Sequence, residues 1–250
     1  RRLMGVPVER LSPADRFFRA LVHEGRGEFT EAKAILDEVG AGLYTPEYLA
    51  CFESQIDFVI GQLPENEAPI VDLATGRGDF IQEVLKRQPR PVIASDFSLS
   101  VLRRDRRWLQ FFDLYDRVSL LAFDARRTPF KDGAVGIMTT NQGLANIRQP
   151  GELLRELRRA VADKFLAISV FYPPQDRENA EAIQQFGLQE MLYRSSAERH
   201  FASAGWSLRA ENCCSGRALP TPSAEILAGA GIDGLPAVET TLEWCSLIAS

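Results

Sequence analysis

The chain has few of the residues from which metal sites and disulfide frameworks are built. It holds two histidines and four cysteines among 250 residues, and no two cysteines form a CxxC pair. Structural zinc needs four closely spaced sulfur or nitrogen ligands, so the sequence predicts no metal site. We expect Cys51, Cys213, Cys214 and Cys245 to be buried, inert thiols.

Long apolar runs are also missing. No run approaches the roughly 18 residues that a membrane helix needs, and residues 1–8 contain no apolar core of a secretory signal. Because the chain does not begin with Met, we expect it to have been trimmed at its start.

An excess of positive charge is absent as well. The formal net charge is −5, which argues against general binding to nucleic acid or to membrane phosphates. Only four of the 29 basic residues are lysines, a bias typical of a GC-rich bacterial genome. Together these absences predict a cytoplasmic, bacterial protein whose partners are neither membranes nor nucleic acids.

The pattern of the chain changes near residue 63. Residues before it predict three helices, at about 12–24, 28–39 and 46–62, and two of them begin with a capping residue followed by proline. After it, short apolar runs alternate with helical stretches, which is typical of a parallel sheet covered on both faces. The predicted strands are 70–73, 91–95, 118–122, 134–139, 165–171, 206–213 and 240–249. The predicted helices between them are 79–88, 99–115 and 151–162, with a further short helix near 223–228.

Apolar and polar residues alternate more in the last predicted strand than in the others, as they do in an antiparallel edge strand.

Polar residues end the strands before the last one. Asp72, Asp96 and Asp124 follow the first three strands, and Asn141 and Tyr172 follow the next two. In an open α/β sheet, ligands bind beyond the carboxyl ends of the strands. One such Asp often only caps the next helix, but three in succession predict a ligand site.

A glycine-rich loop follows the first strand, in the segment DLATGRGDF at residues 72–80. Gly76 and Gly78 permit positive φ and a close approach of the backbone to a ligand. The helix that follows has free N–H groups at its start.

Two other phosphate-binding loops are excluded. The NAD fingerprint needs a small residue where Ile81 stands. A literal GxGxxG at Gly229, Gly231 and Gly234 follows no predicted strand, so we interpret it as a chance match. A Walker loop is absent, which argues against nucleoside triphosphate chemistry.

These motifs resemble those of the class I S-adenosylmethionine (SAM)-dependent methyltransferases. Residues 71–80 are similar to the first loop of that family, with Ala74 where a glycine is common. Residues 93–98, IASDFS, resemble the motif whose acid binds the ribose hydroxyls, and residues 123–125, FDA, the motif that meets the adenine. Residues 128–133, TPFKDG, resemble the turn into the fourth strand. The resemblance covers residues 70–170 and, more loosely, 201–206.

The resemblance implies an α/β fold: a Rossmann-like, doubly wound, mostly parallel seven-stranded sheet with the last strand antiparallel, plus an N-terminal helical extension. Residues 1–62 would form a lid or cap, and residues 63–250 a SAM-binding methyltransferase domain. SAM would be the cofactor and S-adenosylhomocysteine (SAH) the product. The residues implied in cofactor binding are Asp72, Ala74, Thr75, Gly76, Gly78, Asp96, Phe97, Asp124, Ala125 and Asn141.

Residue chemistry suits these roles. Asp96 can accept hydrogen bonds from two ribose hydroxyls, and Asp124 one from the adenine amino group. The N–H of Ala125 can serve a ring nitrogen, and Asp72 can face the ammonium group. The methionine moiety would lie against the two glycines of the loop.

The sequence assigns no catalytic residue. Transfer from a sulfonium is an in-line displacement that alignment can accelerate, and a base is needed only where the acceptor must lose a proton. Weak candidates are Asn141, Tyr172 and His200. The histidine that often follows the fourth strand in this family is absent. The (N/D)PP(Y/F) sequence of adenine and amide methylation is absent too.

We therefore predict a small-molecule acceptor. An inactive SAM-binding regulatory protein and an RNA methyltransferase are the alternatives, and the sequence does not define the oligomeric state.

Two groups of side chains each allow two interpretations. One group of aromatic residues either lines an apolar pocket or packs on the sheet: Phe17, Phe18, Tyr44, Tyr48 and Phe52. Arginines 103, 104, 106 and 107 form either a solvated helix face or a surface for RNA or an acidic partner.

Overall fold

The computed structural model describes residues 3–65, 68–221 and 234–250. Three helices come before the sheet: α1 (Pro13–Arg26), α2 (Phe29–Leu43) and α3 (Pro46–Gly61). The strands are β1 (Ile70–Leu73), β2 (Val92–Asp96), β3 (Val118–Ala122), β4 (Val135–Asn141), β5 (Val161–Phe171), β6 (Leu208–Ala218) and β7 (Thr240–Ala249). The remaining helices are α4 (Asp79–Arg87), α5 (Leu99–Phe111), α6 (Pro150–Ala160), α7 (Arg177–Phe186), α8 (Gln189–Leu192) and α9 (Arg194–Ser203).

The seven strands form one sheet in the order β3-β2-β1-β4-β5-β7-β6. Strands β1 to β5 pair in parallel, and β7 is antiparallel to both β5 and β6. The expected seven-stranded, mostly parallel sheet with an antiparallel last strand is therefore confirmed. The strand order reverses between β1 and β4, which places the switch point at the glycine loop.

The edge position predicted for the last strand is wrong. β7 lies between β5 and β6, and β6 is the edge. The β7 sequence, TTLEWCSLIA, is buried at most positions, including Trp244 and Leu247, as an interior strand requires. The short helix expected near 223–228 lies outside the described residues, as do Gly229 and Gly231.

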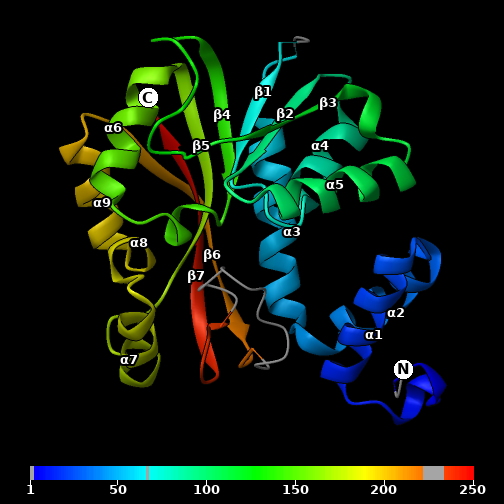
Figure 1. The fold of residues 1–250 in the computed structure, drawn as a ribbon. Helices are drawn as coiled ribbons and strands as arrows, with labels where there is room; N and C mark the ends of the chain where they lie inside the picture. Colours follow the sequence, from blue (N-terminus) through cyan, green and yellow to red (C-terminus); the bar gives the residue numbers. More distant parts are fainter. Residues whose placement is uncertain (1–2, 66–67, 222–233) are drawn as a thin grey trace.

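Helices cover both faces of the sheet (Figure 1). One apolar core joins the sheet to α3, α4 and α5, through residues such as Ile56, Val84 and Leu109. The other joins it to α6 and α9, through residues such as Leu153 and Phe201. Within the described ranges no helix is long and apolar enough to cross a membrane.

Helices α1 and α2 form a hairpin that stands apart from the sheet (Figure 1). It has a small core of its own, built on Phe17, Ala20, Ile35 and Val39. The predicted cap at the start of α1 is present, because the Asp15 N–H donates to the Ser12 side chain over 3.1 Å. Because the hairpin has a separate core, additional contacts must hold it against the rest of the protein.

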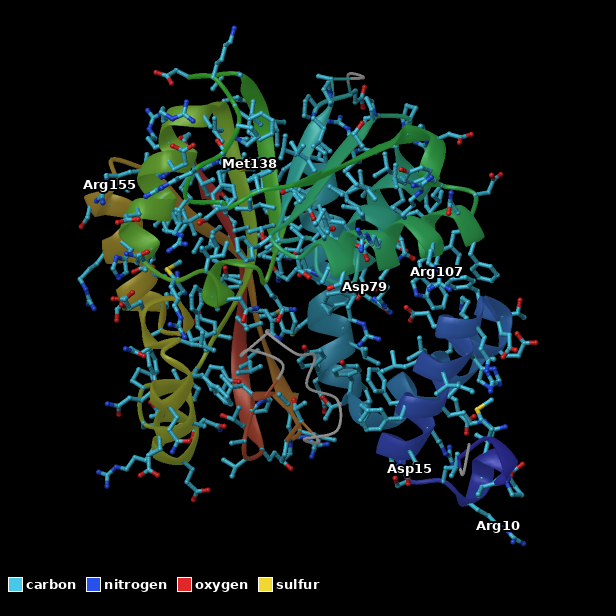
Figure 2. The ribbon with its side chains drawn as sticks, viewed as in Figure 1. Arg10, Asp15, Asp79, Arg107, Met138 and Arg155 are labelled. Atoms are coloured by element: carbon cyan, nitrogen blue, oxygen red, sulfur yellow. A yellow bond between two sulfur atoms is a disulfide. The ribbon has the colours of Figure 1, made fainter. Side chains whose placement is uncertain are left out.

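The hairpin contacts α5 through the arginine run. Arg104 Nε lies 3.0 Å from a carboxylate oxygen of the buried Glu24, and Arg107 donates to the Glu24 carbonyl over 2.6 Å. Figure 2 shows Arg107 on the side of α5 that faces the hairpin. Reading the whole run as a solvated face was therefore wrong for these two arginines, whereas Arg103 and Arg106 are exposed.

Two of the cysteines differ from expectation. Cys213 and Cys245 form a disulfide between β6 and β7, whereas Cys51 and Cys214 are free. Within the described part of the chain, one group of three potential metal ligands gathers closely enough to hold an ion, namely Cys213, Glu243 and Cys245. The disulfide engages both of its sulfur atoms, so this group offers no thiolate pair.

Candidate functional site

The loop between β1 and α4 has the backbone that its glycines allow. Gly76 and Gly78 have φ of 56° and 74°, and Ala74 has φ of 53°. Gly78 is the N-cap of α4, and its N–H donates to the Thr75 carbonyl over 2.9 Å. Ala74 thus adopts the left-handed conformation that favours glycine, the residue commonly found there in the family it resembles.

The end of β4 packs tightly against this loop. Thr140 Oγ1 donates to the Leu73 carbonyl over 2.7 Å. A Cβ added to Gly143 would lie 2.8 Å from the Ala74 Cβ and 3.2 Å from the Leu73 oxygen. Gln142, which lies in the chain between the end of β4 and Gly143, has a positive φ of 57°. Positive φ values therefore occur on both sides of the switch point, at Ala74 and at Gln142.

Gly143→Ala is expected to destabilise the protein by about 1–3 kcal/mol, because the added methyl group would force apart β4 and the glycine loop. The free energy of unfolding in urea measures this. Gly136→Ala, in β4, is the matched control, because a Cβ there meets nothing within 4 Å. Equal stability of the two variants would contradict the tight junction.

The side chain of Asp72, in β1, is buried next to the glycine loop. It is 1% exposed, and Thr139 Oγ1 donates to its carboxyl group over 2.7 Å. Burial raises the pKa of Asp72 to about 7, although the Thr139 and Thr75 hydroxyls oppose the shift. A positive ligand group at the loop would stabilise the charged form of this carboxyl.

Asp96, at the end of β2, is tied to the same loop. Its carboxylate accepts a hydrogen bond from the Gly76 N–H over 3.3 Å and from the Ser98 N–H over 2.8 Å. The next residue, Phe97, leaves its ring 79% exposed. The acid that accepts the Gly76 N–H is therefore followed directly in the chain by an exposed aromatic residue.

Asp124 follows the edge strand β3 and is held by an arginine. Arg126 Nη2 and Nε lie 2.7 and 3.0 Å from its two oxygens, and these hydrogen bonds lower the pKa of Asp124. The Ala125 residue beside it is 9% exposed. The sequence predicted Asp124 as an acceptor for the adenine amino group, and the structure adds a neutralising arginine beside it.

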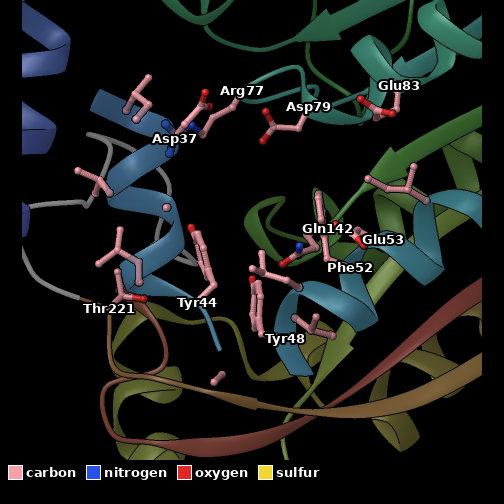
Figure 3. A pocket seen from close by; sticks show the side chains of 18 of the residues that line it. Asp37, Tyr44, Tyr48, Phe52, Glu53, Arg77, Asp79, Glu83, Gln142 and Thr221 are labelled. Carbon is pink, nitrogen blue, oxygen red and sulfur yellow. The ribbon is translucent and has the colours of Figure 1, made fainter. Parts of the chain in front are cut away.

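A cavity of about 760 Å³ opens between the glycine loop, α3 and the hairpin of α1 and α2. Figure 3 shows Arg77, Asp79 and Glu83 along one side and Tyr44, Tyr48 and Phe52 across from them. Arg77 also lies over the Phe17 ring of the hairpin, 5.5 Å from its centroid. The cavity thus has a charged side next to the glycine loop and an aromatic side on the helices.

Four of the five aromatic residues singled out in the sequence line this cavity: Phe17, Tyr44, Tyr48 and Phe52. Phe18 does not, and its side chain is 44% exposed. Lining a pocket therefore fits these four residues, and packing on the sheet also fits Tyr48 and Phe52, whose rings meet Trp244 of β7 edge-on. Neither interpretation fits Phe18.

The three weak catalytic candidates lie in different surroundings. Asn141 Oδ1 is buried at the end of β4 and lacks a hydrogen-bond partner among the described residues. Tyr172 lines the cavity, but burial raises its pKa, which disfavours a phenolate. His200 lies on α9, 4.0 Å from Glu190, and does not line the cavity.

Sequence analysis missed Gln142, Arg77 and two residues of α5. Asp105 and Trp108 of that helix are buried, with 1% and 6% exposure. Trp108 lines the cavity, and the Asp105 carboxyl faces Gly78. The one available signal was an acid alone within the run RRDRR, on the apolar side of the helix.

A parallel sheet with a glycine loop and strand-end acids at its switch point defines a Rossmann-like, cofactor-binding protein. Residues 70–164 match a family model described as a methyltransferase domain. A demethylmenaquinone methyltransferase of Lactiplantibacillus plantarum is 27% identical over 155 residues, which are 55% of this chain and 65% of that protein. The aligned segment thus spans less than two thirds of that relative.

Solved structures share the fold. The YcgJ protein of Bacillus subtilis has a TM-score of 0.62 at 13% identity, over 79% of this chain and 97% of that one. Geranyl diphosphate C-methyltransferase of Streptomyces coelicolor, with Mg²⁺, geranyl diphosphate and SAH, has a TM-score of 0.56 at 18% identity, over 81% of each chain. Residues 70–164 are therefore similar to a methyltransferase domain, and the described chain shares the fold of these solved structures.

Proposed function

We propose that the protein transfers a methyl group from SAM to a small-molecule acceptor. The observation that carries this proposal is that one cavity reaches from the glycine loop, at Arg77, to the aromatic side chains of α3. A cofactor on the loop and an acceptor against the helices would then meet in line. Alignment of this kind supplies much of the acceleration in a displacement with a good leaving group.

The cofactor half of the proposal rests on the loop and on the three acids. Asp96 presents its carboxylate to the ribose hydroxyls, and the exposed Phe97 ring gives the adenine a flat apolar surface. Arg126 leaves the Asp124 carboxylate lone pairs for an amino group, and the Ala125 N–H can serve a ring nitrogen. The methionine moiety lies on Gly76 and Gly78, which carry no side chain of their own.

The acceptor half rests on the aromatic side of the cavity. Tyr44 and Tyr48 stack with ring centroids 4.9 Å apart, and Phe52 and Tyr172 line the same space. Such a surface favours a flat or elongated apolar molecule. The relatives named for demethylmenaquinone and for geranyl diphosphate act, by those names, on molecules with apolar parts.

The chain divides, in this proposal, into a cap within residues 1–62 and a SAM-binding domain of residues 63–250. The hairpin closes one wall of the cavity and is attached to α5 chiefly by Glu24 and Phe29. The Phe29 ring lies 4.9 Å from the Trp108 ring and 5.0 Å from the Arg107 guanidinium. Movement about these contacts would admit the acceptor and then exclude water from it.

Phe29→Ala is expected to weaken the attachment of the hairpin by about 1–2 kcal/mol, because the ring contacts with α5 are lost. Faster amide hydrogen exchange in α1 and α2, with unchanged exchange in β1 and β4, measures this. Phe186→Ala, at an exposed site on α7, is the matched control. An unchanged hairpin in Phe29→Ala would rule out this attachment.

Calorimetric titration with SAM, SAH and NAD tests the proposed cofactor. Micromolar binding of the first two and none of NAD is expected; failure of SAM and SAH to bind would overturn the proposal. Product formation with a panel of apolar phenols, quinols and prenyl compounds then separates an enzyme from an inactive SAM-binding protein. Salt-dependent RNA binding would instead favour an RNA methyltransferase.

A further inference from the structure

A buried carboxyl group without a partner lies beneath the cofactor loop. Asp105 is 1% exposed, and neither of its oxygens has a hydrogen-bond partner within the described ranges. Its Oδ1 would lie 3.6 Å from a Cβ built on Gly78, so the carboxyl group faces the loop from below. Unsatisfied buried carboxyl groups are rare, because each one loses its hydration without compensation.

The charges around Asp105 do not compensate it. The nearest cation is Arg104 on the same helix, and it is engaged by Glu24 of the hairpin. The other charged neighbours are Asp96 from β2, Asp79 from α4 and Asp72 from β1, all of them acidic. Burial, with these three like charges, raises the pKa of Asp105 to about 8. Among the groups that act on Asp105, three acids therefore oppose one cation, Arg104.

Two structural roles fail to explain this carboxyl group. It does not cap α4, because Gly78 is the N-cap and no side chain accepts from the helix start. It belongs to no group of three metal ligands that lie close together among the residues described. A ligand that brings positive charge to the loop would offset the cost of the buried carboxylate.

We propose that Asp105 is a specificity-determining residue that favours the positively charged sulfonium cofactor over its neutral thioether product. This inference rests on the proposed function, in which the methionine moiety lies on Gly76 and Gly78. SAM carries one more positive charge than SAH, at the sulfur atom, and the two molecules are otherwise alike apart from the methyl group. A carboxylate on the far side of the same loop distinguishes them through the low-dielectric protein, without contact.

The test compares Asp105→Asn with the wild-type protein in calorimetric titrations with SAM, SAH and sinefungin, which has an ammonium in place of the sulfonium. Asparagine keeps the size of the side chain and removes the charge. We expect affinity for SAM and sinefungin to fall about tenfold and affinity for SAH to change less than twofold. Asp116→Asn, which removes an exposed carboxylate after α5, is the matched control and should change none of the three.

Proton release gives a second readout that a purely structural role would not change. At pH 7, SAM binding to the wild-type protein should release more protons than SAH binding, because the ligand charge favours the ionised form of Asp105. Titrations in phosphate and in Tris measure this release, and Asp105→Asn should lose the difference attributable to Asp105. Asp105→Ser provides a second uncharged side chain if the asparagine variant folds poorly.

The outcomes separate the two proposals. Absence of SAM binding to the wild-type protein would overturn the proposed function. Normal SAM binding with an equal loss of SAM and SAH affinity in Asp105→Asn would leave that function standing and overturn the charge selection. If Asp105→Asn left both the ratio of SAM to SAH affinity and the proton release unchanged, the charge selection would likewise be overturned.

Discussion

The free energy of unfolding of the ligand-free protein is expected to fall by several kcal/mol between about pH 5 and pH 8.5, since one pKa unit corresponds to about 1.4 kcal/mol. Burial raises the pKa of Asp72 to about 7 and that of Asp105 to about 8, from an ordinary 3.8. A raised carboxyl pKa means that the folded state holds protons which the unfolded state has released. This stability is fully present below pH 4 and is lost as the pH rises through the folded pKa values.

Urea unfolding at pH 5, 7 and 8.5 measures this fall. Asp105→Asn should flatten it, because a neutral amide has no proton to lose, and it should raise the stability at pH 8.5 above that of the wild-type protein. Asp116→Asn, an exposed site, should follow the wild-type curve. Parallel curves for the wild-type protein and Asp105→Asn would show that Asp105 is already ionised in the folded protein at pH 5.

The local features of the fold could be predicted from the sequence. Proline after a capping residue marked the starts of α1 and α3, and the apolar runs placed β1 and β3 at their observed bounds. These signals are local, because caps and short buried strands are encoded in neighbouring residues. The glycine loop was found for the same reason, since positive φ at Gly76 and Gly78 needs that residue type.

The features that depend on distant parts of the chain were missed. The pattern of α5 shows that the arginines lie on a polar face, but only the folded chain shows that Glu24 of the hairpin meets Arg104. The edge position given to β7 failed because alternation along a strand does not identify its neighbours. Asp105 was hidden by the arginines around it, since burial arises from the contact of α5 with the loop.

The same limit applies to the candidate site. Strand-end acids could be selected from the sequence because parallel strands bring their carboxyl ends to one edge of the sheet. That Asp96 accepts the Gly76 N–H, and that Arg126 pairs with Asp124, depends on side-chain geometry across strands. The acceptor side depends even more on tertiary structure, because α1, α2, α3 and the start of β7 all contribute to the cavity.

Asp96→Ala is expected to weaken both SAM and SAH binding by roughly 5- to 150-fold, because the ribose hydroxyls lose charge-assisted hydrogen bonds of about 1–3 kcal/mol. Calorimetric titration measures both affinities, with Asp116→Ala as the control at an exposed site. The Gly76 N–H also loses its acceptor, so urea unfolding must first show that the variant keeps its stability. Asp96→Asn, which keeps one carbonyl acceptor, should fall between the wild-type protein and the alanine variant. The ribose is common to both ligands, so the loss here affects SAH as well, whereas the loss in Asp105→Asn is confined to the cationic ligands. Unchanged affinity in Asp96→Ala would remove this carboxylate from the cofactor site.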